Sequence, residues 1–90
     1  MRKPPDTIDG AKVLWWAWAD EGPFGFCGDV EIHGLAICRY KSGIVYRFSC
    51  DRDWQTVNDS PHRDEEQAKT ALPQNYSASA DRIHWHRYTD

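Results

Sequence analysis

The feature that most constrains the fold is a two-residue alternation between Ile44 and Asp51. Its apolar positions are Ile44, Tyr46, Phe48 and Cys50, and they are separated by Val45, Arg47, Ser49 and Asp51. Successive side chains of a β-strand point to opposite faces. The segment therefore predicts a strand that places four apolar side chains in a core and leaves its polar side chains in water.

A second apolar run, Ala11 to Ala19, also favours a strand, because three tryptophans and a valine are more typical of strands than of helices. Val13, Trp15 and Ala17 would line one face of it, and Leu14, Trp16 and Trp18 the other. Both faces are apolar, as in a strand that is covered on two sides or that faces a partner. Residues 1–10 contain two prolines and show no periodicity, and they are interpreted as a flexible lead-in.

Shorter segments complete the predicted sheet. Strands are expected at Asp29–His33, Leu35–Tyr40, Trp54–Asn58 and Arg82–Tyr88. Lys41-Ser42-Gly43 supplies a hairpin turn with Gly43 at positive φ, and Asp51-Arg52-Asp53 a bend. Asp59-Ser60-Pro61 would end the 54–58 strand, residues 73–81 would form a loop, and Ile83 and Trp85 would point inward.

One short helix is expected at residues 64–72. Asp64 can cap its free amide groups while Gln67 reaches back, and Pro73 stops it. Ala68, Ala71 and Leu72 form a narrow apolar stripe suited to packing on a sheet.

These elements predict an α+β fold: residues 11–90 form a single domain, a mostly antiparallel sheet of four to five strands with the helix on one face. A chain of 90 residues with 40% hydrophobic content has room for one modest core. The segment 20–35 is long for a loop in so small a domain, so it either hides an element or carries function.

The three cysteines, Cys27, Cys38 and Cys50, have no CxxC spacing. In the predicted hairpin Cys38 lies opposite Tyr46 or Arg47, which leaves Cys50 about 10–13 Å away along the strand. A disulfide requires Cα atoms within about 7 Å, so this pair is expected to stay reduced. Free thiols are typical of the cytoplasm.

The run Tyr46–Asp51, with Trp54, Val57–Asp59 and the helix that begins Glu65-Glu66-Gln67, resembles a small bacterial family of uncharacterised α+β proteins. The resemblance covers residues 44–73 and extends to Ile83-His84-Trp85. It implies a small cytoplasmic α+β domain and supplies no catalytic residues.

Charge and hydropathy exclude two classes of partner. The net charge is −3 and no basic run exceeds two residues, so the basic stripe of a nucleic-acid-binding protein is missing. The sequence has no apolar run of 18 residues and no apolar segment after Met1, so neither a membrane span nor an export signal is predicted.

His84 and His86 have the spacing most typical of a site. On a strand both imidazoles would leave one face, ~6.6 Å apart at Cβ, within reach of one zinc ion. Further ligands would have to come from elsewhere, such as His33 or His62. The alternative is that the two histidines occupy the wet face of a strand.

Other chemistry is weakly supported. Asp51 and Asp53 have the appearance of solvated bend residues, and the acidic flanks of Cys27 work against a reactive thiolate. The same flanks, and the lack of a Lys-Ser/Thr pair, argue against a phosphate cradle at Gly22–Gly25. No catalytic residue is assigned.

The remaining candidates are aromatic residues that would serve in protein interaction: Trp16, Trp18, Phe24 and Phe26. Large rings are enriched at interface hot spots. The sequence predicts a non-catalytic, mildly acidic and aromatic-rich protein-interaction or regulatory module, of an immunity-like type. It would bind another protein or form a homodimer. The alternative is a metal-binding protein that uses His84 and His86.

Overall fold

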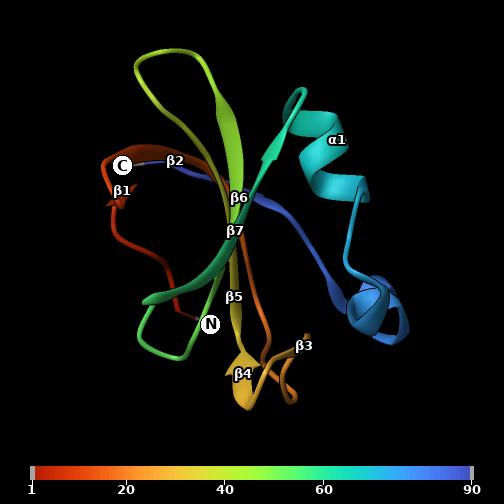
Figure 1. Ribbon diagram of the computed structural model, residues 1–90. Helices are drawn as coiled ribbons and strands as arrows, with labels where there is room; N and C mark the ends of the chain where they lie inside the picture. Colours follow the sequence, from red (N-terminus) through yellow and green to blue (C-terminus); the bar gives the residue numbers. More distant parts are fainter. Residues whose placement is uncertain (1, 90) are drawn as a thin grey trace.

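The structure, a computed structural model, is organised around one antiparallel β-sheet (Figure 1). It describes residues 2–89, without the side chains of residues 77–79. In chain order the elements are β1 (Thr7–Ile8), β2 (Ala11–Trp18), β3 (Gly25–Cys27), β4 (Val30–Ile32), β5 (Gly34–Arg39), β6 (Val45–Cys50), β7 (Thr56–His62), α1 (Glu65–Thr70), the 3₁₀ helix η1 (Gln74–Arg82) and β8 (His86–Arg87). The strand order across the sheet is β1-β2-β5-β6-β7, and β8 pairs with β2.

The antiparallel sheet with one short α-helix agrees with the predicted architecture, although β8 and β1 bring the main sheet to six strands. Residues in strands far outnumber those in α1, so the α+β description holds only in outline. Figure 1 shows α1 and η1 on the same side of the sheet. Ala68 of α1 packs with Ile37 and Val45, and Tyr76 of η1 packs with Leu35.

The predicted strand at β6 is confirmed, but the prediction that its polar side chains are exposed to water is wrong. Phe48 and Cys50 are fully buried on one face, as expected. Arg47 and Ser49, expected in water, are also buried, because α1 and η1 cover the opposite face. Ile44, expected in the core, lies before the strand and is half exposed.

The buried Arg47 side chain joins β6 to the C-terminal end of α1. Its Nη1 donates to the carbonyl oxygens of Ala68 at 2.9 Å and Ala71 at 2.7 Å. The last carbonyls of a helix have no partner within the helix and carry partial negative charge. A buried guanidinium supplies both the missing hydrogen-bond donors and a compensating positive charge. Burial lowers the pKa of Arg47. Beside it, the Tyr76 hydroxyl donates to Ser49 Oγ at 3.1 Å.

The N-terminal end of α1 is fixed by its cap and by Trp15. Asp64 Oδ1 accepts from the Gln67 amide at 2.8 Å, as predicted, but Gln67 Oε1 reaches one residue further, to the amide of Arg63 at 2.7 Å. Trp15 Nε1 donates to Glu65 Oε1 at 2.7 Å. Lys69 Nζ lies 3.5 Å from the centre of the Trp15 ring, a cation–π contact. The helix ends at Thr70, earlier than the predicted residue 72.

A β-bulge in β2 corrects the predicted faces of that strand. Val13 pairs with Cys38 and Trp15 with Ile37, so Leu14 is an extra residue on its strand. An extra residue reverses the alternation beyond it. Val13 therefore shares a core cluster with Trp16, whereas Trp15 packs on the α1 side of the sheet.

Residues 7–10, assigned to the lead-in, form a hairpin with β2. Asp9 (φ 50°) and Gly10 (φ 81°) make the turn, and Thr7 pairs with Lys12. Asp-Gly is the preferred dipeptide of a two-residue hairpin, a signal that the prolines nearby obscured. Ile8 is buried in the core as a result.

The long segment 20–35 hides an element, the β3–β4 hairpin. Ala19 N donates to His33 O, and Phe24 N to Ile32 O, both at 2.8 Å. These two bonds continue the β2–β5 ladder into β3–β4 and leave residues 20–23 as an excursion. The hairpin is thus an extension of the central strand pair beyond the main sheet.

Two predicted strand limits are wrong. β7 begins at Thr56 and continues through Pro61 to His62, whereas the sequence predicts a strand from Trp54 to Asn58. Because β7 pairs only with β6 among the described residues, a proline without an N–H group is tolerated at this edge. The last strand is only His86–Arg87, because η1 occupies residues expected to form a loop and the start of that strand.

The bend after β6 contains the predicted polar residues, and the Trp54 ring that follows them packs against the sheet. Asp51 Oδ1 accepts from the amides of Asp53 and Gln55, both at 2.9 Å. Trp54 takes a positive φ of 60°, and its ring is buried against Gly34. Positive φ is strained for a bulky residue, so the packing of the ring offsets that strain.

The cysteines behave as small apolar residues in the core. Cys38 pairs with Tyr46 across the hairpin, as predicted, and all three thiols are free. Cys38 and Cys50 are fully buried. Burial raises the pKa of Cys50 to about 12 and that of Cys38 well above its usual range.

Replacing the buried arginine tests its role as a clamp. We expect Arg47→Met to lower the free energy of unfolding by about 2–4 kcal/mol, since each hydrogen bond from a charged donor contributes about 1.5–3 kcal/mol. Urea denaturation would measure the change. Arg39→Met is the matched control, because Arg39 forms an exposed ion pair with Glu65 and should cost under about 1 kcal/mol. Equal costs for the two variants would contradict the role.

A second prediction concerns Gly34. A Cβ atom at Gly34 would lie 2.5 Å from Cζ3 of Trp54, so Gly34→Ala should destabilise the fold by about 1–3 kcal/mol through overpacking. The cost should shrink when Trp54 is replaced by Leu, and a double-mutant cycle with denaturant unfolding measures the coupling. Additive costs would show that the ring does not set the need for glycine.

Candidate functional site

The β3–β4 hairpin carries two of the three large apolar side chains that are exposed in the part of the chain that the structure describes. Three large apolar side chains are exposed there: Phe26 (50%), Ile44 (50%) and Val30 (41%). Two of the three lie on this hairpin, on either side of its turn. Isolated exposed apolar residues are common, and two in one short element that extends from the sheet make this hairpin a candidate contact surface.

Pairing within the hairpin places the two side chains on opposite faces. Phe26 is opposite Glu31, and Cys27 is opposite Val30. Since cross-strand partners share a face, Phe26 and Val30 point in opposite directions. Gly28 forms the turn at φ 61°. The tip of the hairpin is therefore apolar on both sides.

The base of the hairpin is fixed on the core by η1. Phe24 and Ile32 are buried beside Tyr76. Gly25 lies under the Tyr76 ring, where a Cβ would come within 2.3 Å of Cδ1. Asn75 Nδ2 donates to the Phe26 carbonyl at 2.6 Å. The base is rigidly packed while the tip extends beyond it.

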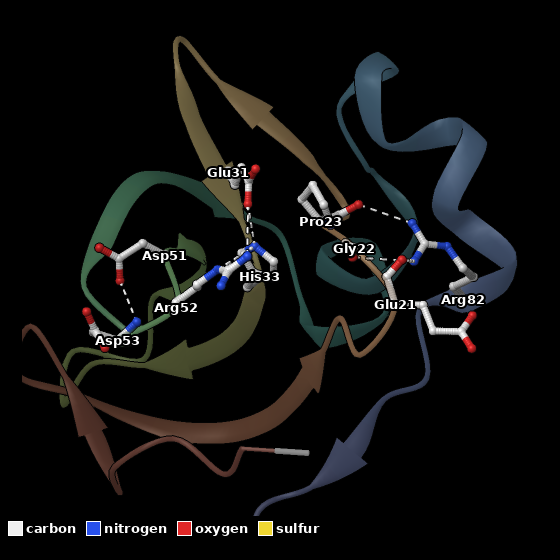
Figure 2. A network of polar contacts seen from close by, with 9 residues as sticks. All are labelled: Glu21, Gly22, Pro23, Glu31, His33, Asp51, Arg52, Asp53 and Arg82. Atoms are coloured by element: carbon white, nitrogen blue, oxygen red, sulfur yellow. Dashed lines mark hydrogen bonds and ion pairs between the residues drawn. The ribbon is translucent and has the colours of Figure 1, made fainter.

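Arg82, at the end of η1, holds the excursion that precedes the hairpin (Figure 2). Its guanidinium donates to three consecutive carbonyl oxygens: Pro23 at 3.1 Å, Gly22 at 3.4 Å and Glu21 at 3.5 Å. Three consecutive carbonyl oxygens can reach one guanidinium group only if the backbone curls around it. Arg82 therefore fixes the shape of residues 21–23.

A second polar group, Glu31, His33 and Arg52, lies at the other side of the base (Figure 2). His33 Nε2 is 2.8 Å from Glu31 Oε1 and 3.3 Å from Arg52 Nε, and Arg52 Nη2 is 3.5 Å from the same Glu31 oxygen. The His33 ring is buried, whereas the other two side chains are largely in water. The hydrogen bond to His33 and the nearby Arg52 charge lower the pKa of Glu31.

Two hollows open around Trp18 at the base of the hairpin. Both are lined by Trp18, Ala19 and Asp20. The larger, about 360 Å³, is completed by Glu21, Arg82, His84 and His86. The smaller, about 320 Å³, is completed by Arg2, Gly22, His33 and Arg52. Acidic and basic groups are mixed in each, so neither has the single sign of charge that selects an ion.

The hairpin itself is acidic. The 26 residues from Val13 to Cys38 contain no Lys or Arg. Their acidic residues are Asp20, Glu21, Asp29 and Glu31, all exposed. The two arginines at the base come from other segments and bind a carboxylate and backbone carbonyls there.

The structure separates the four aromatic residues singled out from the sequence. Trp16 (7% exposed) and Phe24 (1%) are in the core, so their rings are not displayed. Trp18 is half-buried, 5.5 Å from Trp54 and 6.0 Å from His33 between ring centres, and it lines both hollows. Phe26 is exposed, as proposed. Trp16 packs in the same core cluster as Val13, and Phe24 packs beside Ile32 and Tyr76 where the chain returns to the sheet.

His84 and His86 both line the larger hollow, in different surroundings. His84 precedes β8 and is exposed, whereas His86 is half-buried with its ring 4.7 Å from that of Trp16. Within the described residues, no group of three or more His, Cys, Asp and Glu side chains could hold a metal ion. His33, the third histidine considered, bonds to Glu31 and Arg52 instead.

Sequence reasoning considered His33 only as a metal ligand and did not place Arg52 or Arg82 at a site. Glu31 and His33 are two residues apart, but Arg52 meets His33 from 19 residues away and Arg82 reaches Glu21 from 61, so no local spacing brings the arginines there. The hairpin had one usable signal, the Gly28-Asp29 dipeptide between two short apolar runs.

Comparisons with protein-family models, with curated proteins and with solved structures find no match. The resemblance over residues 44–73 stays a prediction. Among the described residues, neither α1 nor η1 has the length and apolar character needed to cross a membrane.

The lowered pKa of Glu31 makes a prediction for acid stability. A carboxyl whose pKa is below its ordinary value of 4.5 in the folded state stabilises that state above this pH, and the effect is lost as the pH falls through the folded pKa. Glu31→Gln should therefore destabilise the protein at pH 7 and match the wild type at pH 2–3. Urea unfolding at both pH values tests this, with exposed Glu21→Gln as the control. An equal loss of unfolding free energy in Glu31→Gln at both pH values would contradict this prediction.

Proposed function

We propose that the protein is a non-catalytic protein-interaction module that docks a partner protein through its β3–β4 hairpin. The observation that carries this proposal is the half-exposed Phe26 ring at the end of a hairpin with a rigid base. Full burial of such a side chain in a partner contributes about 1.5–3 kcal/mol. A rigid base limits the conformational entropy lost on binding.

The shape of the hairpin indicates the shape of the partner surface. Phe26 and Val30 lie on opposite faces, so a flat partner could bury only one of them. A cleft that receives the tip buries both. The backbone groups of the turn would also have to be satisfied inside such a cleft, as in recognition of extended segments by main-chain hydrogen bonds.

The charge around the hairpin supports a basic partner. Asp29 lies in the turn and Glu31 beside Phe26, and no Lys or Arg belongs to the same segment. We propose an apolar cleft with Lys or Arg side chains on its rim. Complementary charge raises the rate of association and excludes acidic surfaces, including nucleic acid.

The three free thiols support a reducing compartment such as the cytoplasm, and the module would act there as a regulatory or immunity-like partner. A second copy of the chain is the other occupant considered. It offers a hollow of mixed polar and apolar lining away from the hairpin, formed by Gly10, Tyr40, Lys41, Ser42, Ile44, Tyr46 and Asp59.

The test compares a hairpin variant with a matched control. Phe26→Ser/Val30→Ser removes both exposed apolar side chains of the tip, and Ile44→Ser removes an equally exposed one elsewhere. The tagged proteins are used to capture partners from a lysate of the source cells. We expect a protein that wild type and Ile44→Ser retain and the hairpin variant loses, with affinity reduced about 30-fold or more, the range of a hot spot.

Two outcomes would change the proposal. Retention that is equal for all three proteins would refute the hairpin as the docking element. Sedimentation measures self-association: a dimer that the hairpin variant abolishes, and that Ile44→Ser weakens because Ile44 lines the receiving hollow, would make a second copy the partner. All these substitutions lie on the surface, so the free energy of unfolding of each variant should be within about 0.5 kcal/mol of the wild-type value. A loss of binding can then be told apart from a loss of folding.

A further inference from the structure

Residues 2–5, which precede β1, form an arm that begins at the bend after β6. Figure 1 shows the N end of the chain beside that bend. Arg2 Nη1 donates to the Arg52 carbonyl at 2.6 Å and lies 3.6 Å from Asp53 Oδ1. In the opposite direction, the indole Nε1–H of Trp54 donates to the Arg2 carbonyl at 3.1 Å. The bend thus offers acceptors to a cationic side chain and a donor to the backbone that carries it.

The arm then crosses to the C-terminal segment. Lys3 Nζ donates to the Thr89 carbonyl and lies 4.5 Å from the centre of the Tyr88 ring, a cation–π contact. Pro4 is buried, although the residues on either side of it are exposed. Two adjacent cationic side chains and a proline are therefore each received by groups of matching chemistry.

The arm is held in the way that a peptide ligand is held, and not as a strand of the sheet. Among the described residues, no backbone–backbone hydrogen bond joins residues 2–5 to the rest of the chain, and the backbone is first bonded at Asp6, whose carbonyl accepts from Val13 N at 3.0 Å. The two prolines of the arm restrict φ and hold the residue before them extended. A segment that is extended in advance loses little conformational entropy on binding, and aromatic-lined grooves recognise such proline-containing segments in other small domains.

The contacts of the arm can open without loss of the sheet. The side chains of Arg2 and Asp53 are both more than half exposed, so water competes for their ion pair. Segments with few buried contacts and few backbone bonds open locally at a small free energy. When the arm opens, the Trp54 indole loses its acceptor, and Arg2 leaves the wall of the smaller hollow beside Trp18. The same surface is then free to receive a second segment of similar chemistry.

We propose that the surface under the arm is a peptide-binding site that the chain's own residues 2–5 occupy, and that its partner is an extended segment of another protein, with two adjacent Lys or Arg residues followed by proline. The arm competes with that segment. It therefore weakens the apparent affinity in proportion to the small fraction of molecules in which the arm is open. This site is separate from the docking proposed for the hairpin, because neither Phe26 nor Val30 enters its contacts.

NMR of the full chain tests the site with a capped peptide, Arg-Lys-Pro-Pro-Asp, which copies residues 2–6. The variant Arg2→Glu/Lys3→Glu should release the arm, because its new carboxylates would face Asp53 and carbonyl oxygens, and the Trp54 Nε1–H resonance should move. Added peptide should return that resonance toward its wild-type position. Wild type should bind the peptide at least about tenfold more weakly, since a minor open state is at most about a tenth of the population.

Two controls separate recognition from a general effect of charge. Lys41→Glu/Arg63→Glu makes the same change in net charge at exposed residues on other parts of the surface, and it should bind the peptide no better than wild type. The peptide Glu-Glu-Pro-Pro-Asp should bind none of these proteins. The Nε1–H resonance of Trp15, which is bonded to Glu65, should stay in place and show that the arm variant is folded. A Trp54 resonance that neither the arm variant nor the peptide moves would overturn the proposal, as would equal affinity of wild type and the arm variant for the peptide.

Discussion

The fold depends on the burial of Arg47 between the sheet and α1. A helix of six residues is far too short to be stable by its own hydrogen bonds, so its place must come from tertiary contacts. The guanidinium holds its last carbonyls, and Trp15 holds its first turn through Glu65. With α1 in place, both faces of the central strands are covered, and a chain of 90 residues gains two layers of core in place of one.

The elements that the sequence predicts well are those coded by neighbouring residues. The Gly43 turn, the cap at Asp64 and the alternation around Phe48 each need only a few residues to specify them, and each is present. Alternation shows which side chains share a face but not what covers that face. The burial of Arg47 therefore could not be predicted, because it depends on α1, about 20 residues further along.

The candidate site was even less accessible from sequence. The β3–β4 hairpin confirms that residues 20–35 hide an element. His33 meets Arg52 from 19 residues away, however, and Arg82 reaches the excursion from about 60. One extra residue, Leu14, was enough to put Trp16 in the same core cluster as Val13 and Trp15 on the α1 side of the sheet. Phe24 is buried and Phe26 is half exposed, although they are only two positions apart in sequence. The difference depends on where the chain returns to the sheet, since Phe24 packs on the core at the base of the hairpin.

The edge strand β7 sets a limit on how this protein can associate. An open strand normally offers a row of donors and acceptors on which another sheet can grow. Pro61 removes one donor from that row, and two copies aligned antiparallel around Asp59 would bring like charges together. Pro61 and Asp59 thus oppose the growth of a larger sheet by strand pairing between molecules at the edge of β7. For the docking proposed at the β3–β4 hairpin, an edge strand that resists pairing is an advantage, because contact through the hairpin tip then involves one partner and does not extend into a larger sheet.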